Sequence, residues 1–194
     1  MRYLFLLLAV CIGQVSLAQQ GDKLITLDDL WKNNTFKIAS VPGFNAMKDG
    51  LRFTKLEKKE KHQEINVYNL AKGDMLQTIF NSEEQKFNGE EIRISGYAFS
   101  EGETRLLLFT EHESVYRRSA KYIVYVYDIA SKDLVRLSDD KVLHATFSPD
   151  AGKVAYVKDN NLYYKELATG KEVAVTIDGK WNHIINGNCD WVYE

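Results

Sequence analysis

The chain has 194 residues, of which 45% are hydrophobic and 27% are charged, a composition typical of soluble globular proteins. Its 25 basic and 27 acidic residues give a formal net charge of −2, so the basic surface on which nucleic-acid binding depends is missing. We therefore expect no nucleic-acid partner. The length is sufficient for one sizeable hydrophobic core.

Residues 1–18 have the pattern of a secretory signal peptide. Arg2 supplies a positive start, residues 3–12 an apolar stretch, and Ser16–Ala18 a small-x-small cleavage site. The apolar stretch is shorter than the ~20 residues that a membrane-spanning helix needs. The pattern predicts an exported protein, periplasmic or secreted, and lipidation at Cys11 is the alternative that would make it membrane-associated.

Removal of the signal peptide leaves a single cysteine, Cys189. An odd cysteine in an exported protein is either a buried free thiol or has a partner outside the sequence, and both readings stay open. The spacing of the four histidines does not suit a metal site. They are His62, His112, His144 and His183. We expect no metal site and no cofactor.

Residues 19–40 are predicted to form an N-terminal arm with one short helix. Thr26 can cap the helix, and the acidic residues that follow it favour the positive end of the helix dipole. Leu27, Leu30 and Trp31 fall on one apolar face of this helix.

From residue 41 onward the sequence changes to short β-strand patterns separated by turns. Three hairpins are predicted, over residues 65–80, 122–137 and 162–177, with Gly73 and Gly170 in two of the turns. Each hairpin follows a turn and an apolar strand, which makes a longer repeated unit.

The turn glycines Gly50, Gly102 and Gly152 mark this repeat at intervals of about 50 residues. Four strands in a repeat of this length are typical of β-propeller blades. We predict an all-β fold, with about three four-stranded blades of an incomplete propeller over residues 41–194. A ring needs at least four blades, so the propeller is expected to continue beyond Glu194. A β-sandwich is the alternative architecture.

Two polar segments of the sequence contain several charged residues. The segment Thr110–Ser119 is predicted as a long polar loop, in which Arg117 and Arg118 can present planar donors to a carbonyl or carboxylate group. From the residues alone, structural and ligand-binding roles both remain open. The mixed charges of Glu57–Lys61 predict a solvated hairpin tip. The sequence contains no Gly-x-Ser-x-Gly motif of a hydrolase nucleophile.

Three motifs together resemble the N-terminal part of dipeptidyl peptidase IV, a serine peptidase of the prolyl oligopeptidase type, in a bacterial exported form. They are the helix sequence of residues 26–33, the strand and turn of residues 147–163, and Asn186-Gly-Asn-Cys-Asp-Trp-Val-Tyr-Glu194. The last motif is the most specific of the three.

The resemblance implies an eight-bladed propeller on an α/β-hydrolase domain that releases dipeptides from peptides with a penultimate proline or alanine. It implies that Arg117 contacts a substrate carbonyl group, although Tyr116 stands where the family usually has tryptophan. It also implies that Glu194 is the first of three glutamates in a substrate-binding stretch, of which the second and third bind the substrate amino group. No catalytic residue is expected in this sequence, and a homodimer is compatible with the resemblance. A non-catalytic exported propeller that acts as a binding scaffold is the alternative.

Overall fold

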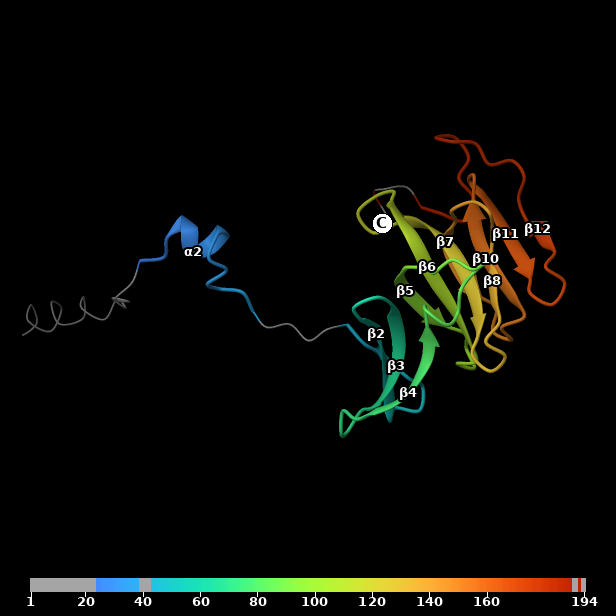
Figure 1. The fold of residues 1–194 in the computed structure, drawn as a ribbon. Helices are drawn as coiled ribbons and strands as arrows, with labels where there is room; N and C mark the ends of the chain where they lie inside the picture. The colour runs from blue at the N-terminus through green and yellow to red at the C-terminus, as the bar shows by residue number, and fades with distance from the viewer. Residues whose placement is uncertain (1–23, 39–42, 190–191, 193–194) are drawn as a thin grey trace, which may run out of the picture. The chain divides into compact units, whose positions relative to one another are not determined.

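A computed structural model describes residues 24–38, 43–189 and 192 (Figure 1). The chain divides into two compact units, residues 1–42 and residues 43–194, and each is described by itself. The predicted signal peptide lies outside the described residues. Among the residues that are described, no helix has the length and apolar character needed to cross a membrane.

The first unit contains one short helix, α2 (Leu27–Trp31). Thr26 caps it as predicted: its Oγ1 accepts a hydrogen bond from the Asp29 N–H at 3.1 Å, and the Asp29 carboxylate accepts one from the Thr26 N–H at 3.1 Å. These reciprocal bonds form a capping box, which satisfies two backbone donors at the start of the helix. The predicted apolar residues Leu27, Leu30 and Trp31 are all exposed in the structure.

The second unit consists of three four-stranded antiparallel sheets, which we call blades 1, 2 and 3. The strands of each blade follow one another in chain order. Blade 1 contains β1 (Asn45–Ala46), β2 (Arg52–Lys58), β3 (Gln63–Asn69) and β4 (Met75–Asn81). Blade 2 contains β5 (Ile94–Phe99), β6 (Arg105–Ser114), β7 (Ala120–Asp128) and β8 (Leu134–Arg136). Blade 3 contains β9 (Leu143–Phe147), β10 (Lys153–Lys158), β11 (Asn161–Glu166) and β12 (Glu172–Ala174).

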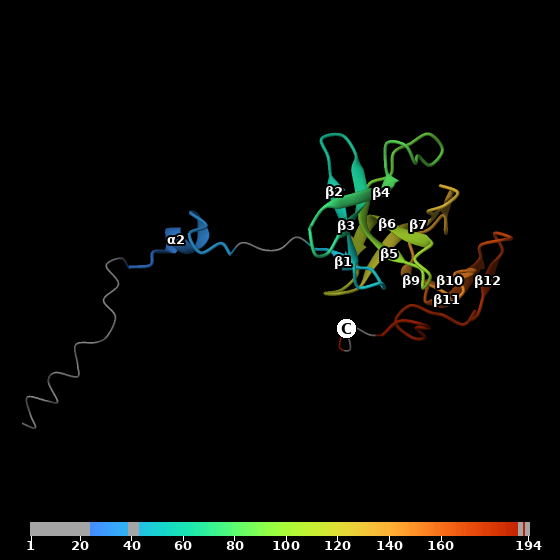
Figure 2. The ribbon, with the colours of Figure 1, turned by 90° about the horizontal axis from the view of Figure 1, so that it is seen from below.

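The predicted all-β fold and its three four-stranded units are confirmed, and the described sheets do not close into a ring (Figures 1 and 2). Two apolar clusters hold the blades together, one between blades 1 and 2 and one between blades 2 and 3. Blade 2 contributes side chains to both clusters, because successive side chains of a strand point to opposite faces. Leu106 and Leu108 belong to the first cluster, whereas Leu107 belongs to the second.

The turn before the second strand of each blade has one residue in the left-handed backbone region. This residue is Gly50 in blade 1 (φ 68°), Glu103 in blade 2 (φ 53°) and Ala151 in blade 3 (φ 55°). In every blade its N–H donates to the carbonyl three residues earlier. The repeat predicted from the sequence is therefore present, but Gly102 and Gly152 stand next to the left-handed position and not in it.

Candidate functional site

The candidate site begins with the hairpin between β6 and β7. The first half of the predicted loop Thr110–Ser119 is strand, because the β6–β7 ladder resumes after an irregularity at Glu111 (φ 50°) and pairs Glu113 with Lys121. Only residues 115–119 form the tip, which the Val115 N–H closes with a hydrogen bond to the Ser119 carbonyl at 2.9 Å. The prediction of a long loop was wrong because a bulge preserves strand pairing that the polar sequence conceals.

Arg117 and Arg118 lie at this tip, and both are exposed. In the part of the chain that the structure describes, neither guanidinium group makes a hydrogen bond or an ion pair. Both therefore present their planar donors to solvent, the condition needed to bind a carbonyl or carboxylate ligand. Since both guanidinium groups are exposed, exposure does not favour one arginine over the other as the ligand-binding residue.

The base of the hairpin is tied to the connection that leads into β9. Lys141 Nζ donates to Glu113 Oε2 at 3.0 Å, and this hydrogen bond is the largest cause that lowers the pKa of the Glu113 carboxyl. Tyr122 and Val142 exchange backbone hydrogen bonds of 3.0 and 2.8 Å. The His112 ring also packs on the Tyr122 ring, with centroids 5.4 Å apart. These contacts fix the direction in which the tip projects.

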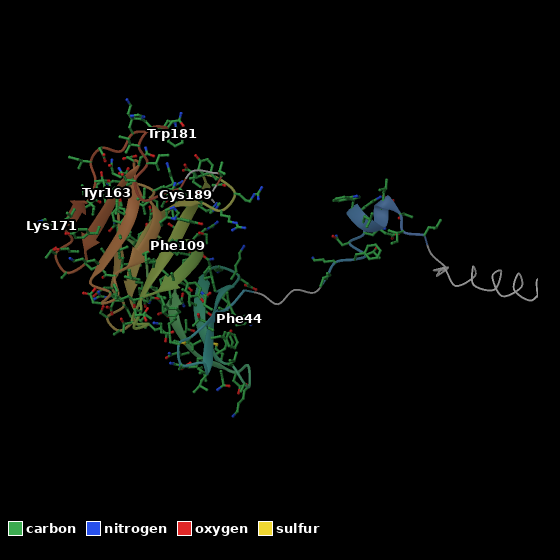
Figure 3. The ribbon with its side chains drawn as sticks, turned by 180° about the vertical axis from the view of Figure 1, so that it is seen from behind. Phe44, Phe109, Tyr163, Lys171, Trp181 and Cys189 are labelled. Carbon is green, nitrogen blue, oxygen red and sulfur yellow. The ribbon has the colours of Figure 1, made fainter. Side chains whose placement is uncertain are left out.

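The C-terminal segment reaches the same end of the blades. After β12 the chain forms a small loop and returns to the start of β9, where His144 Nε2 and Asn188 Oδ1 lie 2.7 Å apart. Figures 1 and 2 both show the red C-terminal segment beside the end of the β6–β7 hairpin, and Figure 3 shows Cys189 at that end. Segments that are about 70 positions apart in the sequence thus lie at the same end of the blades.

The outcome for the predicted site residues is mixed. Arg117 lies on the exposed tip, whereas Glu194 lies outside the described residues, so its role in substrate binding stays a prediction. Cys189 is an exposed free thiol, and the interpretation as a buried thiol was wrong. No group of three or more metal-ligating side chains occurs among the described residues.

A second polar cluster, which the sequence did not indicate, covers one face of blade 1. The Glu57 carboxylate accepts hydrogen bonds from Lys59 Nζ at 2.9 Å, the Tyr68 hydroxyl at 2.5 Å and Asn66 Nδ2 at 3.2 Å. These donors, with Lys59 the largest cause, lower the pKa of the Glu57 carboxyl to about 2. In the predicted solvated tip, Glu57 and Lys58 are therefore the last residues of β2, and only residues 59–61 lie in the connection to β3. Glu57 and Lys59 join this cluster.

The stability of the protein should decrease as the pH falls from about 4.5 to about 2. The Glu57 carboxyl has a lower pKa in the folded chain than its ordinary value of 4.5, so its stabilising contribution is complete above 4.5 and is lost on protonation. In the Glu57→Gln variant this part of the pH dependence should be missing, as urea denaturation over a pH series would measure. Glu60→Gln, at an exposed position in the connection that follows β2, is the matched control. Parallel pH profiles of Glu57→Gln and the unchanged protein would contradict the assignment.

Comparison with known proteins gives a consistent result. Residues 100–194 match the family model of the dipeptidyl peptidase IV N-terminal region. The dipeptidyl peptidase 4 of Porphyromonas gingivalis superposes with a TM-score of 0.75 and 37% identity, over 90% of this chain and 25% of that chain.

Curated relatives match at lower identity. Human prolyl endopeptidase FAP is 30% identical over 67% of this chain, and dipeptidyl aminopeptidase B of Saccharomyces cerevisiae is 34% identical over 55%. The chain spans only 17% and 13% of the lengths of these two relatives. The similarity therefore concerns one part of each longer protein.

Proposed function

Because this chain is similar to the N-terminal region of dipeptidyl peptidase IV, we propose that it is the propeller part of a serine exopeptidase. The whole enzyme releases Xaa-Pro or Xaa-Ala dipeptides from the N-termini of peptides. Its catalytic serine, histidine and aspartate belong to an α/β-hydrolase domain outside this sequence, where the serine attacks and the histidine acts as base. The propeller part limits access to that domain and helps to bind the substrate.

The proposed chemistry of substrate binding follows from charge and geometry. Arg117 donates a hydrogen bond to a backbone carbonyl oxygen of the substrate, and a charged donor makes this bond stronger than a neutral one. Carboxylates in the stretch that begins at Glu194 hold the protonated amino terminus of the substrate. Only a chain end brings a free amino group to this position, so the enzyme releases dipeptides and does not cleave within a chain.

One observation supports this proposal above the others: the exposed arginine tip and the segment ending in Asn188 and Cys189 lie at the same end of the blades (Figures 1 and 2). A substrate that spans this end touches both. The segment before the tip is tied down by Glu113 and Lys141, so the tip is placed before substrate arrives. Such preorganisation reduces the ordering cost of binding.

Replacement of Arg117 by alanine in the full-length enzyme should lower kcat/KM for a Gly-Pro-p-nitroanilide substrate on the order of 10- to 150-fold. This range corresponds to the loss of a hydrogen bond from a charged donor, about 1.5–3 kcal/mol. The matched control is Arg118→Ala, which removes the neighbouring exposed arginine. We expect that variant to retain most of the activity.

Three results would change the proposal. An unaltered kcat/KM in Arg117→Ala would return this residue to a structural role, and a loss confined to Arg118→Ala would assign the contact to the other arginine. Absence of Pro-specific dipeptide release from the unchanged full-length protein would favour a non-catalytic propeller scaffold. We also propose that the protein is exported, which is tested by measuring whether the full-length protein is recovered in the periplasmic or secreted fraction of the cells.

A further inference from the structure

The C-terminal segment is held to blade 3 by one buried side chain, Asn161. This residue begins β11 and is only 8% exposed. Its Oδ1 accepts hydrogen bonds from the Gly179 N–H at 2.8 Å and the Thr176 hydroxyl at 3.1 Å, with Asn186 Nδ2 at 3.5 Å. Three points of the segment that follows β12 thus converge on a single amide oxygen.

Backbone contacts reinforce this arrangement at the turn before β11. The Asn186 N–H donates to the Asn160 carbonyl at 3.0 Å, and the Asn186 amide also donates to Asp178 Oδ1 at 3.0 Å. Gly179 lies so close that a Cβ added to it would be 2.4 Å from the Asn160 carbonyl oxygen. The path of the segment is therefore restricted by shape as well as by hydrogen bonds.

A second contact holds the far end of the segment. His144 projects from β9 in the left-handed region (φ 56°), and its Nε2 lies 2.7 Å from Asn188 Oδ1. Between the two contacts, Gly187 (φ 75°) packs against blade 3, because a Cβ there would lie 2.7 Å from a Val157 methyl carbon. Histidine is, with asparagine and aspartate, one of the residue types found most often in this backbone region after glycine.

We propose that Asn161 and His144 are positioning residues that form a clamp on the segment Thr176–Asn188. The clamp fixes the point on blade 3 from which the chain continues toward Glu194. This inference rests on the proposed function, in which that stretch binds the substrate amino group. Neither residue touches the substrate in this proposal. Both act through the segment that they hold.

The clamp has one readout that needs no enzymatic activity. In the full-length protein, Asn161→Ala removes the acceptor of the Gly179 N–H, so hydrogen–deuterium exchange in the peptide covering residues 177–189 should become faster. His144→Ala should accelerate exchange only near Asn188, because the Asn161 contacts persist. His183→Ala, in the exposed loop of the same segment, is the matched control and should leave exchange unchanged.

The second readout is the split between KM and kcat. We expect Asn161→Ala and His144→Ala to raise KM for Gly-Pro-p-nitroanilide roughly 2- to 10-fold, the effect of one or two neutral hydrogen bonds, with kcat nearly unchanged. Asn161→Asp keeps the acceptor oxygen, so its KM should lie between that of Asn161→Ala and that of the unchanged protein. A variant that merely unfolds would lower the active fraction and therefore kcat.

The outcomes separate this inference from the proposed function. Faster exchange with an unchanged KM would overturn the positioning role while dipeptide release continues. Unchanged exchange in both alanine variants would overturn the clamp itself, whatever the activity. A full-length protein that releases no dipeptides contradicts the proposed function, and with it the substrate-positioning part of the clamp.

Discussion

Replacement of Leu107 by alanine is expected to destabilise the protein by about 2–5 kcal/mol, the cost of removing a large side chain from a packed core. Leu107 is 1% exposed and belongs to the apolar cluster between blades 2 and 3. That cluster holds together the two blades that carry the arginine tip and the C-terminal clamp. Urea denaturation followed by circular dichroism measures the change.

The control removes a leucine of the same size from an exposed place. Leu76 in β4 is 52% exposed, so Leu76→Ala should alter the free energy of unfolding by no more than about 0.5 kcal/mol. A Leu107→Ala variant as stable as Leu76→Ala would show that the contact between blades 2 and 3 adds little to stability.

Gly179→Ala is expected to cost about 1–3 kcal/mol or more, since overpacking forces the surrounding structure to move. The added Cβ would lie 2.4 Å from the Asn160 carbonyl oxygen and 2.7 Å from Asn161 Cγ. The first of these atoms belongs to the backbone, which cannot turn away as the end of a side chain can. Thermal unfolding gives the size of the loss, and hydrogen exchange shows whether it begins in residues 177–189.

Gly102→Ala is the matched control for this substitution. Its added Cβ would have only a Thr104 methyl carbon at 3.9 Å, and its backbone does not require a positive φ. It should therefore change stability little, and a less flexible unfolded chain could add a few tenths of a kcal/mol. Equal effects of the two substitutions would mean that the segment relaxes around Gly179 at low cost.

Several features could be predicted from the sequence because they depend on neighbours in the chain. The Thr26 cap and its partner Asp29 are three residues apart, and hairpin turns such as that at Gly73 (φ 75°) need only a local signal. The three blades followed from strands and turns that recur at a constant interval. Their alternating side chains then determine which faces pack together.

The tertiary structure alone revealed the features that join distant parts of the chain. Asn161 looks like an ordinary turn residue until Gly179 and Asn186 are found on its oxygen, and nothing in the sequence marks His144 as a partner of Asn188. In blades 2 and 3, the left-handed residue of the turn is also the neighbour of the glycine that marks the repeat, and not that glycine itself.

The physical reason is the same in each case. Local propensity and periodicity are properties of a short stretch, so the sequence by itself determined the all-β class, the blade repeat and the helix cap of this protein. A hydrogen bond between residues tens of positions apart exists only after folding has brought its donor and acceptor together. The tertiary structure therefore decided which side chains lie at the end of the blades shared by the arginine tip and the C-terminal segment.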